Sequence, residues 1–456
     1  MNLKYLLSVV SLSLLFAGCK KDWLEARPST DLVVPQSIED YQALLDNTEI
    51  FNINEPVIGF MAGEQFHLSG SDWQNIPVQT FKNAYIWAED IYQGEEGVSG
   101  WWESYKKVLY TNVVLEGIVK VTPKAINQIA WNNVKGSALF LRALEFYNLS
   151  QLFCKAYNTA TANTDLGIPL RTSSDINAPS VRATLQQTYD QIINDLKESR
   201  DLLPNIPTVK SRPSKGAADA LLARIYLSME EYVKAGDAAN KALQSSNELI
   251  DYNTLNPVSP SPFPSLLNGN KEVIFYVQIQ GVAALNPPTM LIDSALYNLY
   301  DSNDLRKSIF FTNSTSGQTF KGFYTGTSFY HFAGLATDEL YLIRAETYAR
   351  ANNVSAALQA LNALLQKRYQ GTFVPVTATN ANDALIKILL ERKKELLYRG
   401  IRWPDLRRLN KDNQFKETLV RNTGTQTYSL TPGDPKYVFL IPPEIIRISG
   451  IQQNIR

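Results

Sequence analysis

The sequence contains few of the residues that usually carry out catalysis or bind metals. Among its 456 residues are two cysteines, Cys19 and Cys154, and two histidines, His67 and His331. These four residues show no metal-binding spacing, and no Gly-x-Ser-x-Gly elbow or phosphate-binding glycine loop occurs. We therefore expect no metal site, no cofactor and no enzyme activity.

The chain also lacks an excess of charge of either sign and a flexible linker. Its 44 basic and 44 acidic residues give no electrostatic reason to expect nucleic acid or an acidic membrane surface as a partner. No Gly/Ser-rich or Pro-rich stretch divides the sequence. Residues 37–456 are therefore expected to form one large, closely built unit or two interlocked halves.

The N-terminus resembles that of a bacterial lipoprotein. A basic start and a short apolar run end in small residues before Cys19. The run is too short to span a bilayer, which predicts a signal peptide at 1–18. Cys19 would become the lipidated first residue of a tether at 19–36, and Lys20 favours the outer membrane over the inner one. The alternative is an ordinary signal peptide with an incidental cysteine. Cys154 then has no disulfide partner within the chain and is expected to be buried.

Two segments share a pattern of small and aromatic residues at helical spacing. The pattern consists of Ala345, Tyr348, Ala357 and Leu361 in one segment, and of Ala223, Tyr226, Ala235 and Ala239 in the other. Alanines at these offsets let two helices approach closely, and the aromatic ring fills the space beside them. The recurrence predicts a mainly α, tetratricopeptide-like scaffold, with helical repeats mainly in 102–250 and 338–411.

Two other segments, 51–100 and 252–337, lack helical periodicity and are rich in aromatic residues, with a strand expected at 272–277. Long irregular segments within a compact protein often carry function, so we expect these loop-rich, partly β-containing segments to face a ligand. Aromatic planes can stack on sugar rings while polar side chains bind the hydroxyls. The candidate ligand-binding residues are Asp72, Trp73, Tyr297, Tyr300, Tyr324 and Tyr330. Packing in the core is the alternative for each aromatic ring.

Charged and apolar motifs follow in the C-terminal part of the chain. Residues 339–346 read ELYLIRAE, residues 390–408 read LERKKELLYRGIRWPDLRR, and residues 437–444 read YVFLIPPE. In this order they resemble the motifs of the SusD/RagB family of outer-membrane nutrient-binding lipoproteins. The resemblance extends from the lipoprotein-like N-terminus to Asn454, although Arg399 stands where the family usually has glutamate.

The resemblance implies a protein at the cell surface that lies on a SusC-like TonB-dependent transporter. It would capture oligosaccharides, or peptides in the RagB branch, and hand them to that transporter. The charged motifs would be structural and form intramolecular ion pairs. The residues concerned are Glu391, Arg392, Glu395, Arg402, Asp405 and Arg408.

The same charged helix has to be weighed as a catalytic site. Glu391 and Glu395 lie one helical turn apart, and paired carboxylates serve glycoside hydrolysis. The neighbouring cations would keep both carboxylates ionised, which does not suit either as the general acid. Two alternative classes of protein are kept beside the nutrient-binding lipoprotein. One is a secreted glycoside hydrolase, and the other is a helical-repeat adaptor that binds only protein.

Overall fold

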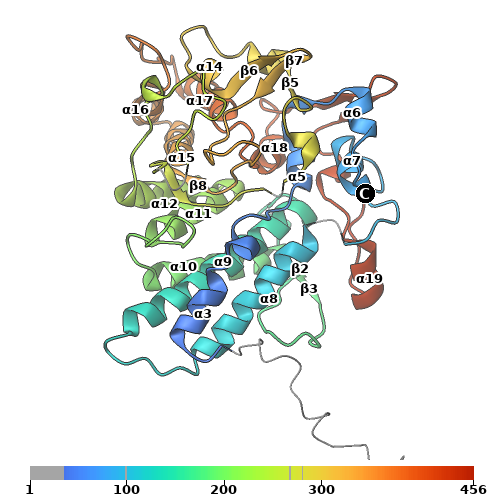
Figure 1. Cartoon of the computed structure of the whole chain (residues 1–456), viewed down its shortest axis with the longest axis vertical. Helices are drawn as coiled ribbons and strands as arrows, with labels where there is room; N and C mark the ends of the chain where they lie inside the picture. Colours follow the sequence, from blue (N-terminus) through green and yellow to red (C-terminus); the bar gives the residue numbers. More distant parts are fainter. Residues whose placement is uncertain (1–34, 98–99, 266–268, 280) are drawn as a thin grey trace, which may run out of the picture. The chain divides into compact units, whose positions relative to one another are not determined.

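Helices are the main elements of the structure, a computed structural model that describes residues 35–97, 100–265, 269–279 and 281–456 (Figure 1). Contacts group residues 37–456 into one unit. The predicted signal peptide and the lipidation site at Cys19 lie outside the described residues. Within the described ranges, no helix combines the length and the apolar character needed to cross a membrane.

A succession of long helices packs neighbour against neighbour. They are α8 (Trp101–Ile118), α9 (Gln128–Phe153), α10 (Leu185–Leu202), α11 (Lys215–Ser228), α12 (Tyr232–Ser245), α15 (Thr337–Arg350), α16 (Val354–Leu365) and α17 (Ala381–Glu395). Each helix from α8 to α12 contacts the next, and α12 contacts α15, which packs on α16 and α17. In Figure 1 the stack runs from α8 and α9 in the lower part to α17 in the upper part.

The two segments with the repeat pattern form helical hairpins, α11–α12 and α15–α16. The alanines of the pattern are completely buried: Ala223, Ala235, Ala239, Ala345 and Ala357. Each tight turn between the helices contains one left-handed residue, Glu230 (φ 63°) or Asn352 (φ 60°), at the same place in the repeat. Because only small side chains allow such close helix crossings, the alanine spacing predicted the pairing correctly. The mainly α, tetratricopeptide-like fold is confirmed.

The segment 51–100 is more regular than expected, because it contains several short helices. After α3 (Ile38–Leu45) they are α4 (Thr48–Phe51), α5 (Ile58–Gly63), α6 (Gly70–Gln74) and α7 (Gln79–Tyr85). Every residue of α5 is buried, between α7 and α18 (Arg402–Leu409). A Cβ on Gly63 would lie 3.1 Å from the backbone of Trp403, a tight contact that glycine avoids. A helix that is buried all round has no polar face, which is why no helical period is visible in the sequence.

Short strands and helices occur in the loop-rich segments and in the connections of the scaffold. The strands are β1 (Phe66–His67), β2 (Leu166–Pro169), β3 (Arg182–Thr184), β4 (Val273–Phe275), β5 (Leu291–Ile292), β6 (Phe311–Ser314), β7 (Gly317–Phe320), β8 (Leu335–Ala336), β9 (Leu419–Asn422) and β10 (Thr427–Leu430). The short helices are α13 (Ser294–Tyr297), α14 (Arg306–Phe310) and α19 (Pro443–Ser449). One antiparallel sheet has the order β1-β5-β7-β6, and its last three strands lie at the top of Figure 1. β4 lies within the predicted strand 272–277 and pairs with β8, which leads into α15.

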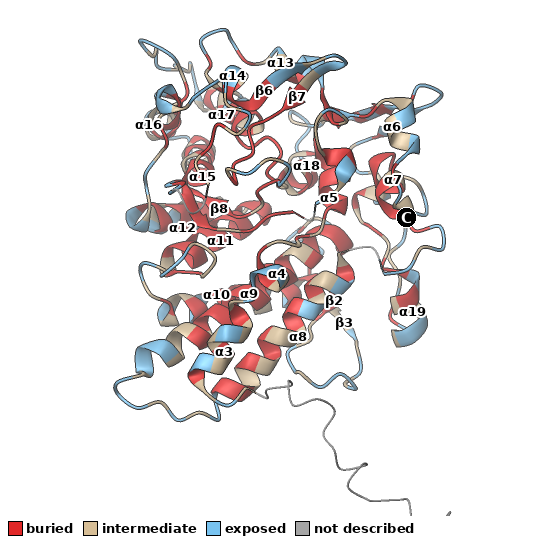
Figure 2. Ribbon diagram, in the orientation of Figure 1, coloured by how far each residue is buried: buried red, intermediate tan, exposed pale blue. Residues whose placement is uncertain are grey.

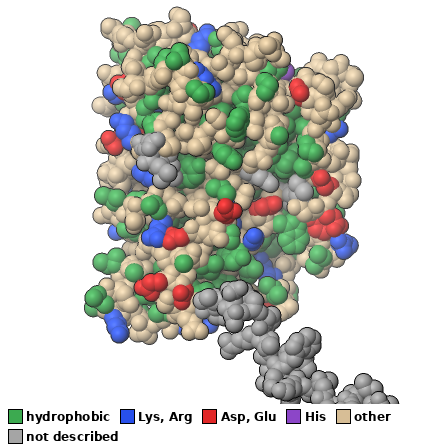
Figure 3. All heavy atoms as spheres, in the orientation of Figure 1, with side chains coloured by type: hydrophobic (Ala, Val, Ile, Leu, Met, Phe, Trp, Pro, Cys, Tyr) green, Lys and Arg blue, Asp and Glu red, His purple; other side chains and the backbone are tan. Residues whose placement is uncertain are grey.

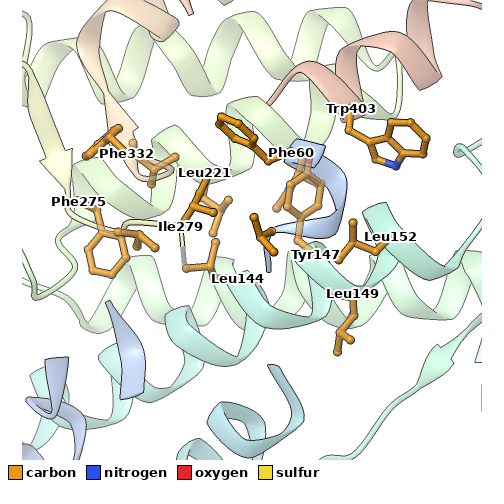
Figure 4. Packing of buried hydrophobic residues seen from close by; sticks show 14 of the residues in the cluster. Phe60, Leu144, Tyr147, Leu149, Leu152, Leu221, Phe275, Ile279, Phe332 and Trp403 are labelled. Carbon is orange, nitrogen blue, oxygen red and sulfur yellow. The ribbon is translucent and has the colours of Figure 1, made fainter. Parts of the chain in front are cut away.

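The hydrophobic core continues from the helical scaffold into the loop-rich half. In Figure 4, Leu144 and Tyr147 of α9 lie near Phe60 of α5 and Ile279, with Trp403 of α18 beside them. Figure 2 shows buried residues running through the helices and strands, while exposed residues concentrate in the connections. The scaffold and the loop-rich half are therefore held together by shared packing. Cys154 is buried in this core, as predicted.

Candidate functional site

A buried cluster of charges joins the irregular segment 252–337 to α17. Arg306 and Arg368, both with 0% of the side chain exposed, lie at its centre. The ion pairs are Arg306 with Asp304 (2.8 Å), Glu391 (2.6 Å) and Glu395 (3.0 Å), and Arg368 with Glu395 (2.7 Å) and Glu272 (2.8 Å). Such charge-assisted contacts offset the cost of removing these groups from water. Glu391 and Glu395 thus serve as counter-ions of buried arginines.

The remaining members of the predicted ion-pair set join α18 to its surroundings. Asp405 binds Arg392 (2.7 Å) and Arg408 (2.9 Å), and Arg402 binds Glu417 (2.5 Å). Although burial by itself would raise the pKa of Asp405, Arg392 and Arg408 lower it to about 2. Asp405 is therefore ionised at all physiological pH values and acts as a fixed anchor between α17 and α18.

Two of the predicted ligand-binding tyrosines lie in the core. Tyr300 is 1% exposed and its hydroxyl donates to the backbone carbonyl of Lys394 (2.9 Å), while Tyr324 is 4% exposed and donates to Glu272. The guanidinium of Arg399 lies 4.1 Å from the ring centre of Tyr324. This corrects the expectation that the two rings face a ligand, because they pack against and hydrogen-bond the buried charge cluster instead.

Tyr297 lines an open groove of about 430 Å³ on the loop-rich half. It lies at the end of α13, its ring centre is 5.4 Å from that of Phe311, and the Nζ of Lys307 lies 4.7 Å from it. The polar side chains that line this groove with it are Ser302, Asp304, Lys307, Ser308, Thr312, Asn313, Gln318, Lys321 and Gln370. The groove combines an aromatic ring with hydroxyl, amide and ammonium groups, which is the chemistry that holds a saccharide.

The polar residues of this groove were not singled out in the sequence. Gln318 lies on the β6–β7 hairpin, whereas Gln370 follows α16 much later in the chain. Each is an isolated polar residue in an irregular segment and belongs to no motif. Only the folding of 252–337 over the end of the 338–365 hairpin brings them to one groove.

Tyr330 lies in an exposed turn together with Phe329. The two side chains are 44% and 50% exposed, and Phe329 has a left-handed backbone with φ 75°. The Oγ1 of Thr325 donates to the backbone carbonyl of Tyr330 (3.0 Å) and holds the turn. A left-handed conformation is costly for an aromatic residue, so the fold maintains this pair in spite of local strain. The two rings form a second exposed aromatic surface.

Asp72 and Trp73 lie on α6, beside the β9–β10 hairpin. Ser69 caps this helix by accepting from the backbone N–H of Asp72 (3.1 Å), and its hydroxyl donates to the Asp72 carboxylate (2.5 Å). The Nε1 of Trp73 donates to the backbone carbonyl of Lys82 (3.0 Å). The half-buried ring of Trp73 lies 4.9 Å from the Nζ of Lys82 and 6.5 Å from the ring of Tyr428. Within the described residues no ring contact links Trp73 or Tyr330 to Tyr297. Neither Trp73 nor Tyr330 belongs to the lining of the groove at Tyr297.

A second groove, of about 660 Å³, lies between α8 and α19. It exposes apolar side chains, among them Trp102, Ile176 and Ile448. Its polar atoms are largely bound within the protein, as when the hydroxyl of Tyr105 donates to the carbonyl of Pro169 (2.7 Å). It thus offers contact area with few free hydrogen-bonding groups, and the groove at Tyr297 suits a saccharide better.

Comparison with known protein families gives two matches. Residues 22–227 match a family described as "Starch-binding associating with outer membrane", and residues 337–439 match the SusD family. The second match contains the charged motifs of α15, α17 and α18. The first contains α8 to α10 and most of α11.

Individual relatives match over nearly the whole chain. SusD-like protein P2 of Formosa agariphila is 23% identical over 99% of this chain and 99% of its own length. The crystal structure of a SusD superfamily protein from Bacteroides thetaiotaomicron has a TM-score of 0.73 at 22% identity, covering 92% of this chain and all of that chain (100%). A structure named laminarin binding SusD-like protein has a TM-score of 0.64 at 18% identity, covering 91% of this chain and 97% of its own. The same helical scaffold is therefore found in proteins of very different sequence.

Proposed function

The chain belongs to the SusD/RagB family, and on that premise we propose that it captures oligosaccharide at the cell surface and delivers it to a SusC-like TonB-dependent transporter. The family is carbohydrate-binding and associated with the outer membrane. A binding role also agrees with the buried charge cluster, in which Glu391 and Glu395 form ion pairs with buried arginines.

The observation that carries the proposal is the groove at Tyr297. Its ring is half-buried at the edge of an open groove whose other walls provide hydroxyl and amide groups. One stacking contact contributes about 0.5–1.5 kcal/mol, and each hydrogen bond about 1 kcal/mol. A single ring with three or four hydrogen bonds then gives a Kd on the order of 1 mM or somewhat below. Weak capture suits a protein that must release its ligand to a transporter.

Anchoring to the outer membrane is proposed from the N-terminal sequence. A lipid on Cys19 would hold the binding unit at the membrane through the tether at 19–36. Replacing Cys19→Ser should move the protein from the membrane fraction to the soluble fraction and abolish incorporation of labelled palmitate. Membrane attachment that persists in this variant would contradict the proposal.

The binding function is tested with soluble protein, residues 20–456, on a glycan array that contains neutral and acidic oligosaccharides. Calorimetry then measures the best-binding glycan with Tyr297→Ala and, as a matched control, with Tyr110→Ala, a half-buried tyrosine on α8. Loss of the stacking ring should weaken binding about 3- to 10-fold, and the control should leave it unchanged.

Peptide capture, as in the RagB branch, is the competing outcome. A peptide array run in parallel distinguishes the two. Binding to peptides with no binding to any glycan would overturn the oligosaccharide proposal, while co-purification with a TonB-dependent transporter tests the partner separately.

A further inference from the structure

One buried lysine in the described residues has no carboxylate partner. The buried lysines are Lys107, Lys321 and Lys394. The ion-pair partners are Glu55 and Glu145 for Lys107, and Asp304 and Glu391 for Lys394. Lys321 is only 9% exposed, and among the described residues its ammonium group forms no ion pair. The Nζ of Lys321 donates a hydrogen bond to the backbone carbonyl of Pro257.

The environment of Lys321 is unfavourable for its charge. Burial lowers the pKa of its ammonium group, and no neighbouring carboxylate raises it again. A buried charge without a counter-ion is costly, and proteins usually keep one only where it has a use. An anion that binds beside Lys321 would supply the missing counter-ion.

Lys321 lines the same groove as Tyr297 and Lys307. The ammonium group of Lys307 donates to the backbone carbonyl of Tyr300 (2.8 Å) and lies 4.7 Å from the ring centre of Tyr297. The carboxylate that lines the groove is that of Asp304, which is 1% exposed and already binds Arg306 and Lys394. Among the described residues, the charges of the groove that have no ion-pair partner are therefore positive.

This local excess differs from the surface as a whole. On the face seen in Figure 3, basic and acidic side chains are interspersed, as the equal totals of 44 each would suggest. Two cations lie beside an aromatic ring, with the amides of Asn313, Gln318 and Gln370 in the same walls. Ammonium groups bind an anionic group more strongly than a neutral one.

We propose that the groove at Tyr297 binds acidic oligosaccharides, with a sugar carboxylate or sulfate ester held between Lys321 and Lys307 while a pyranose ring stacks on Tyr297. The inference rests on the proposed function and narrows its substrate class. The shared chemistry is an anionic group on a sugar ring. Uronic acids and sulfated sugars are the two sources of such an anionic group. A neutral glycan lacks the negative charge that would compensate the two ammonium groups.

The test compares tetrasaccharides of equal length by calorimetry on residues 20–456. The probes are tetragalacturonate as the carboxylated sugar, a κ-carrageenan tetrasaccharide as the sulfated sugar, and laminaritetraose as the neutral one. At least one acidic probe should bind about tenfold or more tightly than the neutral one in about 50 mM salt, and the preference should shrink in about 500 mM salt because salt screens the charges.

Lys321→Met and Lys307→Gln should each reduce the acidic preference several-fold, because each should weaken binding of the acidic probes much more than binding of the neutral one. Lys124→Met, which removes an exposed lysine in the α8–α9 connection, is the charge-matched control and should have no effect. A thermal melt gives a second readout, because removing an uncompensated buried charge should raise the Tm of Lys321→Met. A purely structural lysine would instead lower the Tm and leave the preference intact.

The outcomes separate this inference from the proposed function. Equal binding of neutral and acidic tetrasaccharides, with the effect of Tyr297→Ala retained, overturns the acidic preference and leaves oligosaccharide capture standing. An acidic preference that survives both lysine substitutions also overturns the assignment to this groove. Binding to acidic peptides with no binding to any sugar would overturn both.

Discussion

The guanidinium group of Arg408 binds the carboxylate of Glu346 through both terminal nitrogens, with Nη1–Oε1 at 2.6 Å and Nη2–Oε2 at 2.9 Å. Glu346 lies on α15 of the second repeat hairpin and Arg408 on α18. The Glu346 side chain is completely buried and also binds Arg350 at 2.9 Å. The pair therefore fastens the last part of the scaffold to α18 and, through α18, to α5.

Replacing Glu346→Gln should lower the free energy of unfolding by about 3 kcal/mol, because Arg408 would keep a buried charge with one partner fewer. Urea denaturation followed by circular dichroism measures this change. Glu198→Gln is a matched control, since Glu198 is 51% exposed in its pair with Lys135 (2.7 Å), and exposed pairs contribute about 0–1 kcal/mol. Equal effects of the two substitutions would show that the buried pair has no special role.

A substitution of Tyr324 should lower stability, whereas a substitution of Tyr297 should weaken ligand binding. Tyr324→Phe removes the hydroxyl that donates to Glu272, whose pKa is raised to about 7 by burial. Leaving that carboxyl short of a donor should cost about 1–3 kcal/mol of unfolding free energy without changing glycan affinity. Tyr297→Ala should do the reverse, weakening binding with little change in stability. Denaturation and calorimetry on both variants check this; a binding loss in Tyr324→Phe at full stability would reinstate Tyr324 as a ligand residue.

His331 should make stability depend on pH. It is 4% exposed, its ring centre lies 4.7 Å from that of Phe60, and burial lowers its pKa from 6.5 to about 4. The unfolded chain then binds a proton below pH 6.5 that the folded protein takes up only near pH 4. The contribution of this group to stability is therefore complete above pH 6.5 and lost as the pH falls to about 4, a change of roughly 3 kcal/mol.

The comparison with His331→Leu isolates this effect. Buried carboxyl groups with raised pKa values, such as Glu64 and Glu145, act in the opposite direction over part of the same range, but they are present in both proteins. The unfolding free energy of wild type minus that of the variant should therefore fall by roughly 2 kcal/mol between pH 7 and pH 4.5. A constant difference across this range would show that His331 does not titrate in the unfolding equilibrium.

Arg407 should hold the end of α9. It is buried and donates to the backbone carbonyls of Gln151 and Cys154, where the last turn of the helix leaves carbonyls without partners. Arg407→Leu should cost about 2 kcal/mol and speed hydrogen exchange of amides near Cys154. Exchange measured by mass spectrometry should leave α11 unaffected. Unchanged protection near Cys154 would mean that the helix end is held by other contacts.

Sequence alone was sufficient for the helical scaffold because helix pairing depends on local spacing. The alanines of 217–243 and 338–365 lie a few residues apart, and their spacing indicates which helix faces can pack closely against each other. The charged motifs of α17 and α18 were recognisable for the same reason, since their members lie within a few turns of one another. The short helix α5 escaped notice because burial on all sides leaves no polar face to mark the period.

The tertiary structure alone decided what the aromatic residues of 252–337 do. The sequence gives no sign that distinguishes Tyr300 and Tyr324 from Tyr297. In the structure, Tyr300 and Tyr324 pack on buried arginines, whereas Tyr297 lines an open groove. Arg306, Arg368 and Lys321 likewise acquire their roles from partners far along the chain, such as Glu395 and Pro257. Local periodicity carries no information about contacts across such separations, whereas burial and charge compensation depend on them entirely.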